Sequence, residues 1–176
     1  MKQFFLSLLE VFEVLIVALV SIYLVYTFIA QPFRVEGSSM EPNFSGGDYL
    51  VVDEISYRFR NPARGEVIVL HNPAKNTEFF IKRIVGLPGE ELIIRNGEVS
   101  IDGKLLKEDY LPPDIGLKGD YYFTLDEGEY FVMGDNRLQS FDSRSWGPLG
   151  RGDIVGTVRV RFWPLGGLET YSLKTS

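Results

Sequence analysis

The sequence contains no cysteine and a single histidine, His71. The chain therefore forms no disulfide bond, although this does not indicate its compartment, because many exported bacterial domains also lack disulfides. Structural zinc sites are built mainly from cysteine and histidine, and the chain has no cysteine and only one histidine. We therefore expect no metal site.

Positive charge is also scarce. The chain has 18 lysines and arginines against 24 aspartates and glutamates, a net charge of −6. Binding to a phosphate backbone needs a clustered positive surface, so nucleic acid is not an expected partner. Internal repeats and low-complexity tracts are absent as well, and 45% of the 176 residues are apolar. This is enough for one packed domain.

One long apolar run is present near the N-terminus. Residues 14–30 form a stretch of 17 residues without a charge. As a helix they would span about 25 Å, and extension back through Val11 and Phe12 reaches the thickness of a hydrocarbon core. We expect residues 1–31 to form one transmembrane helix that anchors the chain in a lipid bilayer. A cleaved export signal is the alternative, but the small-x-small cleavage pattern is missing near residues 28–30.

The remainder, residues 32–176, alternates short apolar segments with glycine, proline and Asn-Gly turns, and no long helical periodicity appears. This pattern is typical of β-strands, so we predict a mainly β fold. Asn96-Gly97 and Asp102-Gly103 are hairpin signals, and a polar, turn-rich stretch of about 96–126 reads as an inserted hairpin region. The expected strands are 49–52, 66–70, 79–85, 91–94, 98–101, 121–124, 129–133 and 154–162.

Two segments carry candidate catalytic groups. Ser39 lies in a Gly-Ser-Ser segment soon after the anchor, a pattern that usually marks only a turn. Lys82 shares one face of its predicted strand with Phe80 and Ile84. Such a lysine either lies at an edge with its stem reaching solvent, which the pattern alone favours, or is buried. Burial would lower the amine pKa from about 10.4 by up to several units, and a serine can use such an amine as its base.

A third segment, residues 133–144, is a polar loop after an apolar strand. It reads either as a solvated turn or as a support for the two candidates above. Ser140 could orient the lysine amine. Asp142 could form an ion pair with Arg144 or with Arg83.

Taken in order, the motifs GSSMEP, GDYLVV, RGEVIVL, IKRIVGLPGE and GDNRLQSFDSRSWGPLG resemble those of the type I signal peptidases, and the resemblance covers almost the whole chain. It implies a signal-peptidase-like antiparallel β-sheet catalytic domain behind one N-terminal transmembrane helix. It also implies a serine endopeptidase without a cofactor. The N-terminus would be cytoplasmic, and the catalytic domain would lie on the outer, periplasmic or extracellular, face of the plasma membrane.

The resemblance assigns the nucleophile to Ser39 and the general base to Lys82. It gives supporting roles near the lysine amine and in the adjoining loop to four residues, Ser140, Asp142, Arg144 and Arg83. The resemblance also implies that Leu70, Phe80 and Val132 lie around the lysine. The backbone N–H of Ser39 is the expected oxyanion donor. Gly37 lacks the side-chain hydroxyl that supplies a second donor in some family members, and Ser38 is a weak substitute.

The implied substrates are the signal peptides of exported preproteins, with small residues at positions −1 and −3 from the cut. Shallow apolar pockets would admit alanine and exclude longer side chains. The residues that match pocket or substrate-contact positions are Phe33, Val35, Met40, Phe44, Val69 and Ile81. We expect a monomer, and the sequence does not specify which preproteins are cut.

Two other interpretations fit parts of the sequence. A Ser39–His71–Asp142 triad would use the histidine as base, although His71 precedes Asn72-Pro73 and suits a surface turn. A non-catalytic, single-pass membrane protein with a β-domain for binding partners would explain the anchor and the strands. It gives no reason for a lysine on the apolar row at position 82.

Overall fold

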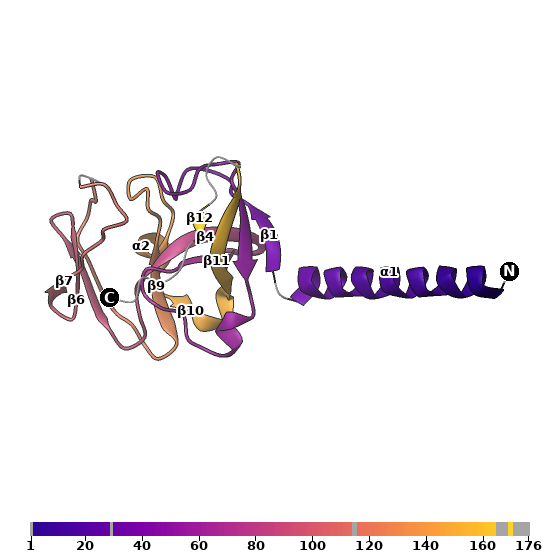
Figure 1. Ribbon diagram of the computed structural model, residues 1–176. Helices are drawn as coiled ribbons and strands as arrows, with labels where there is room; N and C mark the ends of the chain where they lie inside the picture. Colours follow the sequence, from indigo (N-terminus) through magenta and orange to yellow (C-terminus); the bar gives the residue numbers. More distant parts are fainter. Residues whose placement is uncertain (1, 29, 114–115, 165–168, 171–176) are drawn as a thin grey trace.

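A computed structural model describes residues 2–28, 30–113, 116–164 and 169–170. Helix α1 (Lys2–Phe28) projects away from a β-rich body (Figure 1). Glycine and proline, the residues least favourable inside a helix, are absent from α1. Within the described residues, no helix is both long enough and apolar enough to cross a membrane, so the expected transmembrane helix is not confirmed.

The body is built on an antiparallel eight-stranded sheet. Strand β3 is buried along most of its length, and its neighbour β4 extends the sheet towards β9. Along the sheet the order is β1 (Ala30–Arg34), β2 (Tyr49–Asp53), β11 (Ile154–Trp163), β3 (Val67–Asn72), β4 (Lys75–Gly86), β9 (Glu129–Met133) and β10 (Leu149–Gly150), with β12 (Glu169–Thr170) paired to β11.

A second, four-stranded sheet lies on the side of the body away from α1 (Figure 1). Its order is β7 (Lys104–Leu105), β6 (Glu98–Ile101), β5 (Glu91–Arg95) and β8 (Tyr121–Thr124). Asn96-Gly97 and Asp102-Gly103 all have positive φ, as tight hairpin turns require. The expected inserted region of about 96–126 contains β6, β7 and β8, and β5 precedes it.

All eight strands predicted from the alternation are present, with ends that differ by a few residues. The structure adds four others, β1, β7, β10 and β12, which are two to five residues long. Strands β7, β10 and β12, of two residues each, are too short to show alternation, and the start of β1 lies within the residues expected to form the anchor. Strand β1 also contains Pro32, which is tolerated because β1 lies at the edge of its sheet. The described residues of the body also form three short helices: η1 (Ser56–Arg58), α2 (Ser143–Trp146) and η2 (Arg151–Asp153).

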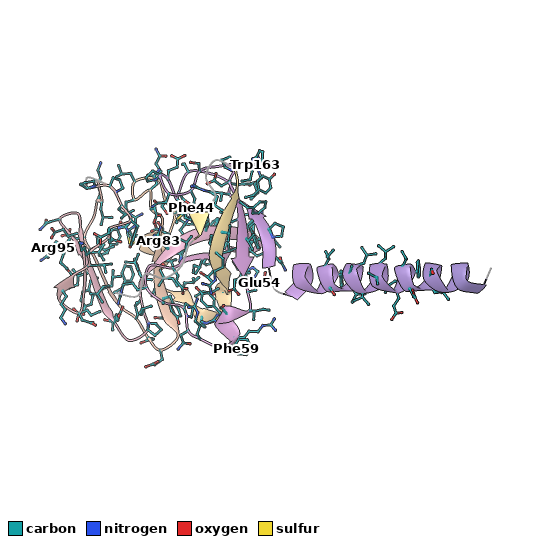
Figure 2. The ribbon with its side chains drawn as sticks, in the orientation of Figure 1. Phe44, Glu54, Phe59, Arg83, Arg95 and Trp163 are labelled. Atoms are coloured by element: carbon teal, nitrogen blue, oxygen red, sulfur yellow. The ribbon has the colours of Figure 1, made fainter. Side chains whose placement is uncertain are left out.

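The apolar core falls into three clusters, and β3 contributes to two of them. Val67 and Val69 pack with Phe44 on one face of the large sheet, while Ile68 and Leu70 pack on the other. A strand covered on both faces reads as a continuous apolar run. The third cluster lies between the second sheet and β9. Figure 2 shows Phe44 and Arg83 inside the body, with Phe59 and Trp163 at its surface.

Candidate active site

The two candidate catalytic residues lie beside each other, although they come from separate segments of the chain. Ser39 lies in the loop between β1 and β2, and Lys82 lies on β4, where it pairs with Ile68 of β3. The Lys82 Nζ is 2.8 Å from the Ser39 Oγ and 2.9 Å from the Ile81 carbonyl oxygen. The fold therefore brings a hydroxyl and an amine within hydrogen-bonding distance.

The Lys82 side chain is buried, with 3% of the residue exposed. The prediction from strand pattern alone, that its stem reaches solvent, is therefore wrong. Desolvation by burial lowers the pKa of Lys82 from 10.5 to about 8, and the charge of Arg144 acts in the same direction. The charges of Asp142 and Asp135 oppose this effect without cancelling it. A substantial fraction of the amine is therefore neutral near pH 8 and able to accept a proton.

Apolar side chains from the same strand and from other segments lie around Lys82. The Nζ lies 5.3 Å from the centre of the Phe80 ring, which itself stacks on Trp146. Leu70 of β3 and Val132 of β9 belong to the same cluster. The three residues expected around the lysine, Leu70, Phe80 and Val132, thus lie together on one side of the sheet.

The loop after β9 is held by Asp142. Its carboxylate accepts hydrogen bonds from Arg144 Nε and Nη2, both at 2.8 Å, and from the Gly134 N–H at 3.0 Å. It also accepts from the Arg144 N–H and so caps α2. Burial alone would raise the pKa of Asp142, but the hydrogen bonds and charge of Arg144 outweigh burial and lower it. Of the two partners that the sequence left open for Asp142, the structure selects Arg144.

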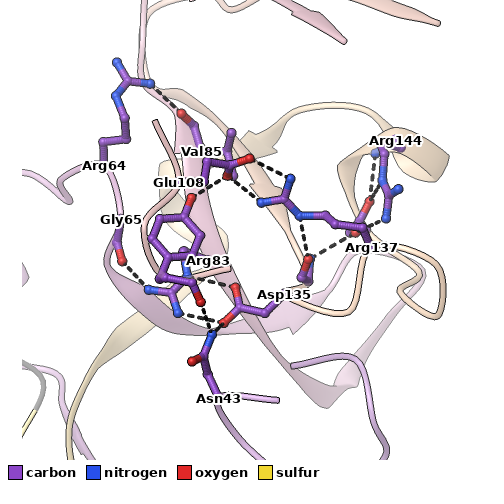
Figure 3. Close-up of polar contacts among 12 residues, drawn as sticks. Asn43, Arg64, Gly65, Arg83, Val85, Glu108, Asp135, Arg137 and Arg144 are labelled. Atoms are coloured by element: carbon purple, nitrogen blue, oxygen red, sulfur yellow. Dashed lines mark hydrogen bonds and ion pairs between the residues drawn. The ribbon is translucent and has the colours of Figure 1, made fainter. Parts of the chain in front are cut away.

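Arg83 pairs instead with Asp135, a residue that the sequence reasoning did not single out. The Arg83 Nε and Nη2 donate to the two Asp135 carboxylate oxygens at 2.8 and 2.6 Å (Figure 3). A third donor, Nη1, bonds the Gly65 carbonyl at 2.8 Å. Asn43 donates to the same carboxylate at 2.8 Å. The only sequence signal for this pair was that Asp135 lies two residues after the end of an apolar strand.

Ser140 packs tightly against the nucleophile loop. A Cβ added to Gly134 would lie 2.3 Å from the Ser140 Oγ and 2.3 Å from the Ser39 carbonyl oxygen. The Ser140 hydroxyl is buried and forms no hydrogen bond of normal geometry among the described residues, although it contributes to the lowered pKa of Asp142. The expected hydrogen bond from Ser140 to Lys82 is thus not formed in this arrangement.

Asn136 holds the backbone around the nucleophile and was also missed from sequence. Its backbone N–H donates to the Ser39 carbonyl at 3.0 Å, and its side-chain amide donates to the Ser38 carbonyl at 3.1 Å. The Ser38 hydroxyl is turned to Gln139, at 3.3 Å. Among the described residues, the Ser39 N–H donates to no acceptor and is available to a bound molecule.

A cavity of about 550 Å³ opens beside the two candidate catalytic residues. Four of the six expected pocket residues line it: Phe33, Val35, Val69 and Ile81. Met40 and Phe44 expose 1% and 0% and pack beneath this lining, in the same cluster as Val35 and Val69. Three charged residues that no sequence motif indicated also line the cavity: Arg34, Glu36 and Glu78.

The alternative base, His71, lies beside Phe79, with ring centres 4.9 Å apart. Ser39 is instead bonded by Lys82, and Asp142 by Arg144 and Gly134. The contacts therefore favour Lys82 over a histidine triad. Among the described residues, no three histidine, cysteine or acidic side chains gather in a way that could hold a metal ion.

Comparison with known families and proteins adds independent information. The family described as signal peptidase, peptidase S26, matches residues 8–163. The probable signal peptidase I-2 of Synechocystis sp. is 39% identical over 165 residues, which cover 89% of this chain and 74% of that protein. The signal peptidase I P of Bacillus subtilis subsp. natto is 33% identical over 169 residues, 90% of this chain and 91% of that protein.

A solved structure is similar as well. The crystal structure of a signal peptidase I from Enterococcus faecalis V583 superposes with a TM-score of 0.50 and 31% sequence identity. The match covers 56% of this chain and 97% of that chain. The mainly β, antiparallel fold is thus shared with that protein.

Proposed function

The chain belongs to the signal peptidase family, peptidase S26, and is thereby a serine endopeptidase; we propose that Ser39 and Lys82 are its catalytic dyad. The observation that carries this proposal is the 2.8 Å contact between Lys82 Nζ and Ser39 Oγ. A buried amine with a pKa of about 8 is suited to act as a base. We propose the signal peptides of exported preproteins as its substrates.

The proposed reaction is acyl transfer. Neutral Lys82 accepts the proton of the Ser39 hydroxyl while Oγ attacks the carbonyl carbon of the scissile bond. The resulting ammonium returns the proton to the leaving amine as the carbon–nitrogen bond breaks, and an ester remains on Ser39. A water molecule, deprotonated by the same amine, then hydrolyses the ester and regenerates the hydroxyl. The reaction needs no cofactor.

The backbone N–H of Ser39 is the proposed donor to the oxyanion. It has no other acceptor among the described residues. A preorganised donor of this kind lowers a barrier by about 3 kcal/mol. Gly37 offers no side chain, and the Ser38 hydroxyl is occupied by Gln139. The proposal therefore includes no second side-chain donor.

The substrate is proposed to bind as an added strand. Among the described strands, β9 pairs with β4 only from Arg83 onward, so the edge of β4 before Lys82 is open on that side. Residues 79–81 of this edge and residues 33–35 both line the cavity. An extended peptide could form main-chain hydrogen bonds there, while the apolar lining accepts small side chains.

We also propose that residues 1–31 anchor the enzyme in the membrane and that residues 32–176 form the catalytic domain on its outer face. The uncharged run of residues 14–30 supports this. Apolar side chains of α1 such as Leu19 and Ile22 are also 65% and 66% exposed. Outside a bilayer such exposure is unfavourable. A short connection from α1 to Ser39 would keep the dyad close to the apolar segment of a preprotein.

Cleavage of a preprotein in detergent micelles tests the mechanism. We expect Ser39→Ala and Lys82→Met to abolish cleavage and His71→Ala to retain it. Cleavage by Lys82→Met at near the wild-type rate would refute the assignment of the base. If the wild type itself never cuts, the non-catalytic binding protein becomes the better interpretation.

A further inference from the structure

The connection between β7 and β8 reaches from the second sheet to the loop that follows β9. Glu108 lies in this segment. Its carboxylate accepts two hydrogen bonds from the Arg137 guanidinium, one of them 2.9 Å long (Figure 3). The Arg137 side chain is fully buried, and that of Glu108 is 11% exposed. A bidentate pair of this kind has a defined geometry as well as a favourable charge interaction.

Arg137 also bonds the loop that contacts the nucleophile. Its Nε donates to the Gly134 carbonyl at 3.0 Å. The Asn136 N–H, one residue before Arg137, donates to the Ser39 carbonyl at 3.0 Å. Glu108 therefore supports a loop whose backbone is bonded directly to the Ser39 backbone.

Tyr110 makes a second contact, with the residue that follows the proposed base. Its ring lies on the guanidinium of Arg83, with the Arg83 Cζ 4.0 Å from the ring centre. Arg83 follows Lys82 on β4 and carries the ion pair with Asp135. The Tyr110 hydroxyl donates to Glu108, and the Tyr110 carbonyl accepts from the side chain of Asn43 at 2.8 Å.

We propose that Glu108 and Tyr110 are positioning residues that hold Ser39 and Lys82 at their reacting distance. Glu108 acts through Arg137, and Tyr110 acts through Arg83. This inference rests on the proposed dyad. Neither residue lines the cavity beside the dyad, so their loss should lower kcat and leave KM for a peptide substrate unchanged. The connection between β7 and β8 thereby supports the geometry of the dyad.

The first test compares Glu108→Gln, Arg137→Gln and the double variant, in the full chain in detergent. Glu98→Gln, on the exposed face of β6, is the matched control. We expect kcat to fall roughly tenfold to hundredfold in each single variant, since a displacement of about 1 Å costs that much, with KM within about twofold of wild type. The double variant should fall no further than Arg137→Gln, because Glu108 is proposed to act only through Arg137, whose bond to the Gly134 carbonyl is lost in both of these variants.

The second test separates the ring of Tyr110 from its hydroxyl. Tyr110→Phe keeps the ring on Arg83 and loses the hydrogen bond to Glu108, so most of kcat should remain. Tyr110→Leu loses both contacts and should fall in kcat as far as Glu108→Gln. Tyr122→Phe, at an exposed position of β8, is the control.

Wild-type kcat in a folded Glu108→Gln or double variant would overturn the proposal, and so would equal changes in kcat and KM. If Glu108→Gln does not fold, the double variant decides, because it removes both charges of the buried pair. Failure of both to fold would assign the pair to stability and equally overturn the proposal. Cleavage by Ser39→Ala, or none by the wild type, would instead refute the proposed function itself.

Discussion

At the scale of single residues, the burial of Lys82 links activity to stability. A charged amine among apolar groups is unfavourable, and this is why the pKa of Lys82 falls from 10.5 to about 8. Between these two pH values the unfolded chain binds a proton that the folded chain does not. The stability of the wild type therefore rises with pH across this interval.

Lys82→Met should thus stabilise the fold while it abolishes cleavage. At pH 7 we expect the free energy of unfolding to increase by about 3 kcal/mol, the equivalent of the pKa shift, and the gain should shrink as the pH approaches 10. Urea unfolding at several pH values, followed by tryptophan fluorescence, measures it. Lys75→Met is the control, because the Lys75 side chain is 63% exposed. A destabilised Lys82→Met at pH 7 would contradict this account.

Gly134 is a second residue that is constrained by its neighbours, which leave no room for a side chain. A Cβ there would lie 2.3 Å from the Ser39 carbonyl oxygen, which is backbone and cannot rotate away. We expect Gly134→Ala to displace Ser39 and to lower kcat by roughly 10². Gly152→Ala, where a Cβ meets nothing within 4 Å, should behave as wild type. Full activity of a folded Gly134→Ala would mean that the loop can move without loss.

At the scale of elements, the start of α2 brings two opposite charges close to Lys82. The charge of Asp142 raises the pKa of the lysine, and that of Arg144 lowers it. Because cleavage needs the neutral amine, the pH–rate profile should rise with a midpoint near pH 8. Substitutions at the two ends of this ion pair should therefore move the midpoint in opposite directions.

We expect Asp142→Asn to shift the midpoint to lower pH and Arg144→Gln to shift it to higher pH. Both variants break a buried pair, so both should also lose several kcal/mol of stability, and profiles should be recorded where each remains folded. Steady-state cleavage of a soluble peptide between pH 6 and 10 provides the measurement. Shifts of the same sign in both variants would show that the local charges do not control the base.

At the scale of the whole molecule, α1 and the β-rich body have separate proposed roles. Strand β1 begins at Ala30 and contributes Phe33 to the cavity, so residues 2–28 can be removed without touching the site. We expect the shortened chain to leave the membrane fraction. It should cleave a soluble peptide at the wild-type rate and a vesicle-embedded preprotein more slowly, because a shared membrane raises the local concentration of substrate.

Cleavage of the soluble peptide and cleavage of the embedded preprotein test different roles of α1. An equal loss on peptide and preprotein would indicate that α1 supports the fold of the body. Unchanged cleavage of the embedded preprotein, or retention of the shortened chain in the membrane fraction, would refute the anchor. The full chain assayed in the same vesicles is the control.

Much of the fold could be predicted because its signals are local. The alternation in residues 79–85 and 129–133, and the Asn-Gly and Asp-Gly turns, depend on neighbours a few residues apart. Such patterns specify a strand or a turn almost regardless of what surrounds it. The two candidate catalytic residues, Ser39 and Lys82, were also recognisable, since motif order over the chain carries the family resemblance.

The partners of these residues were decided only by the tertiary structure. The period of a strand puts Lys82 on an apolar row, but whether that row is covered depends on Leu70, Val132 and Trp146, which come from other segments. Arg83 could pair with several carboxylates, and only the fold brings Asp135 to it. The amino-acid sequence by itself determined the eight strands with clear alternation, the hairpin turns and the reactive groups. The packing of distant segments determined which groups are desolvated and which charges meet, because desolvation and ion pairing depend on distance in space and not along the chain.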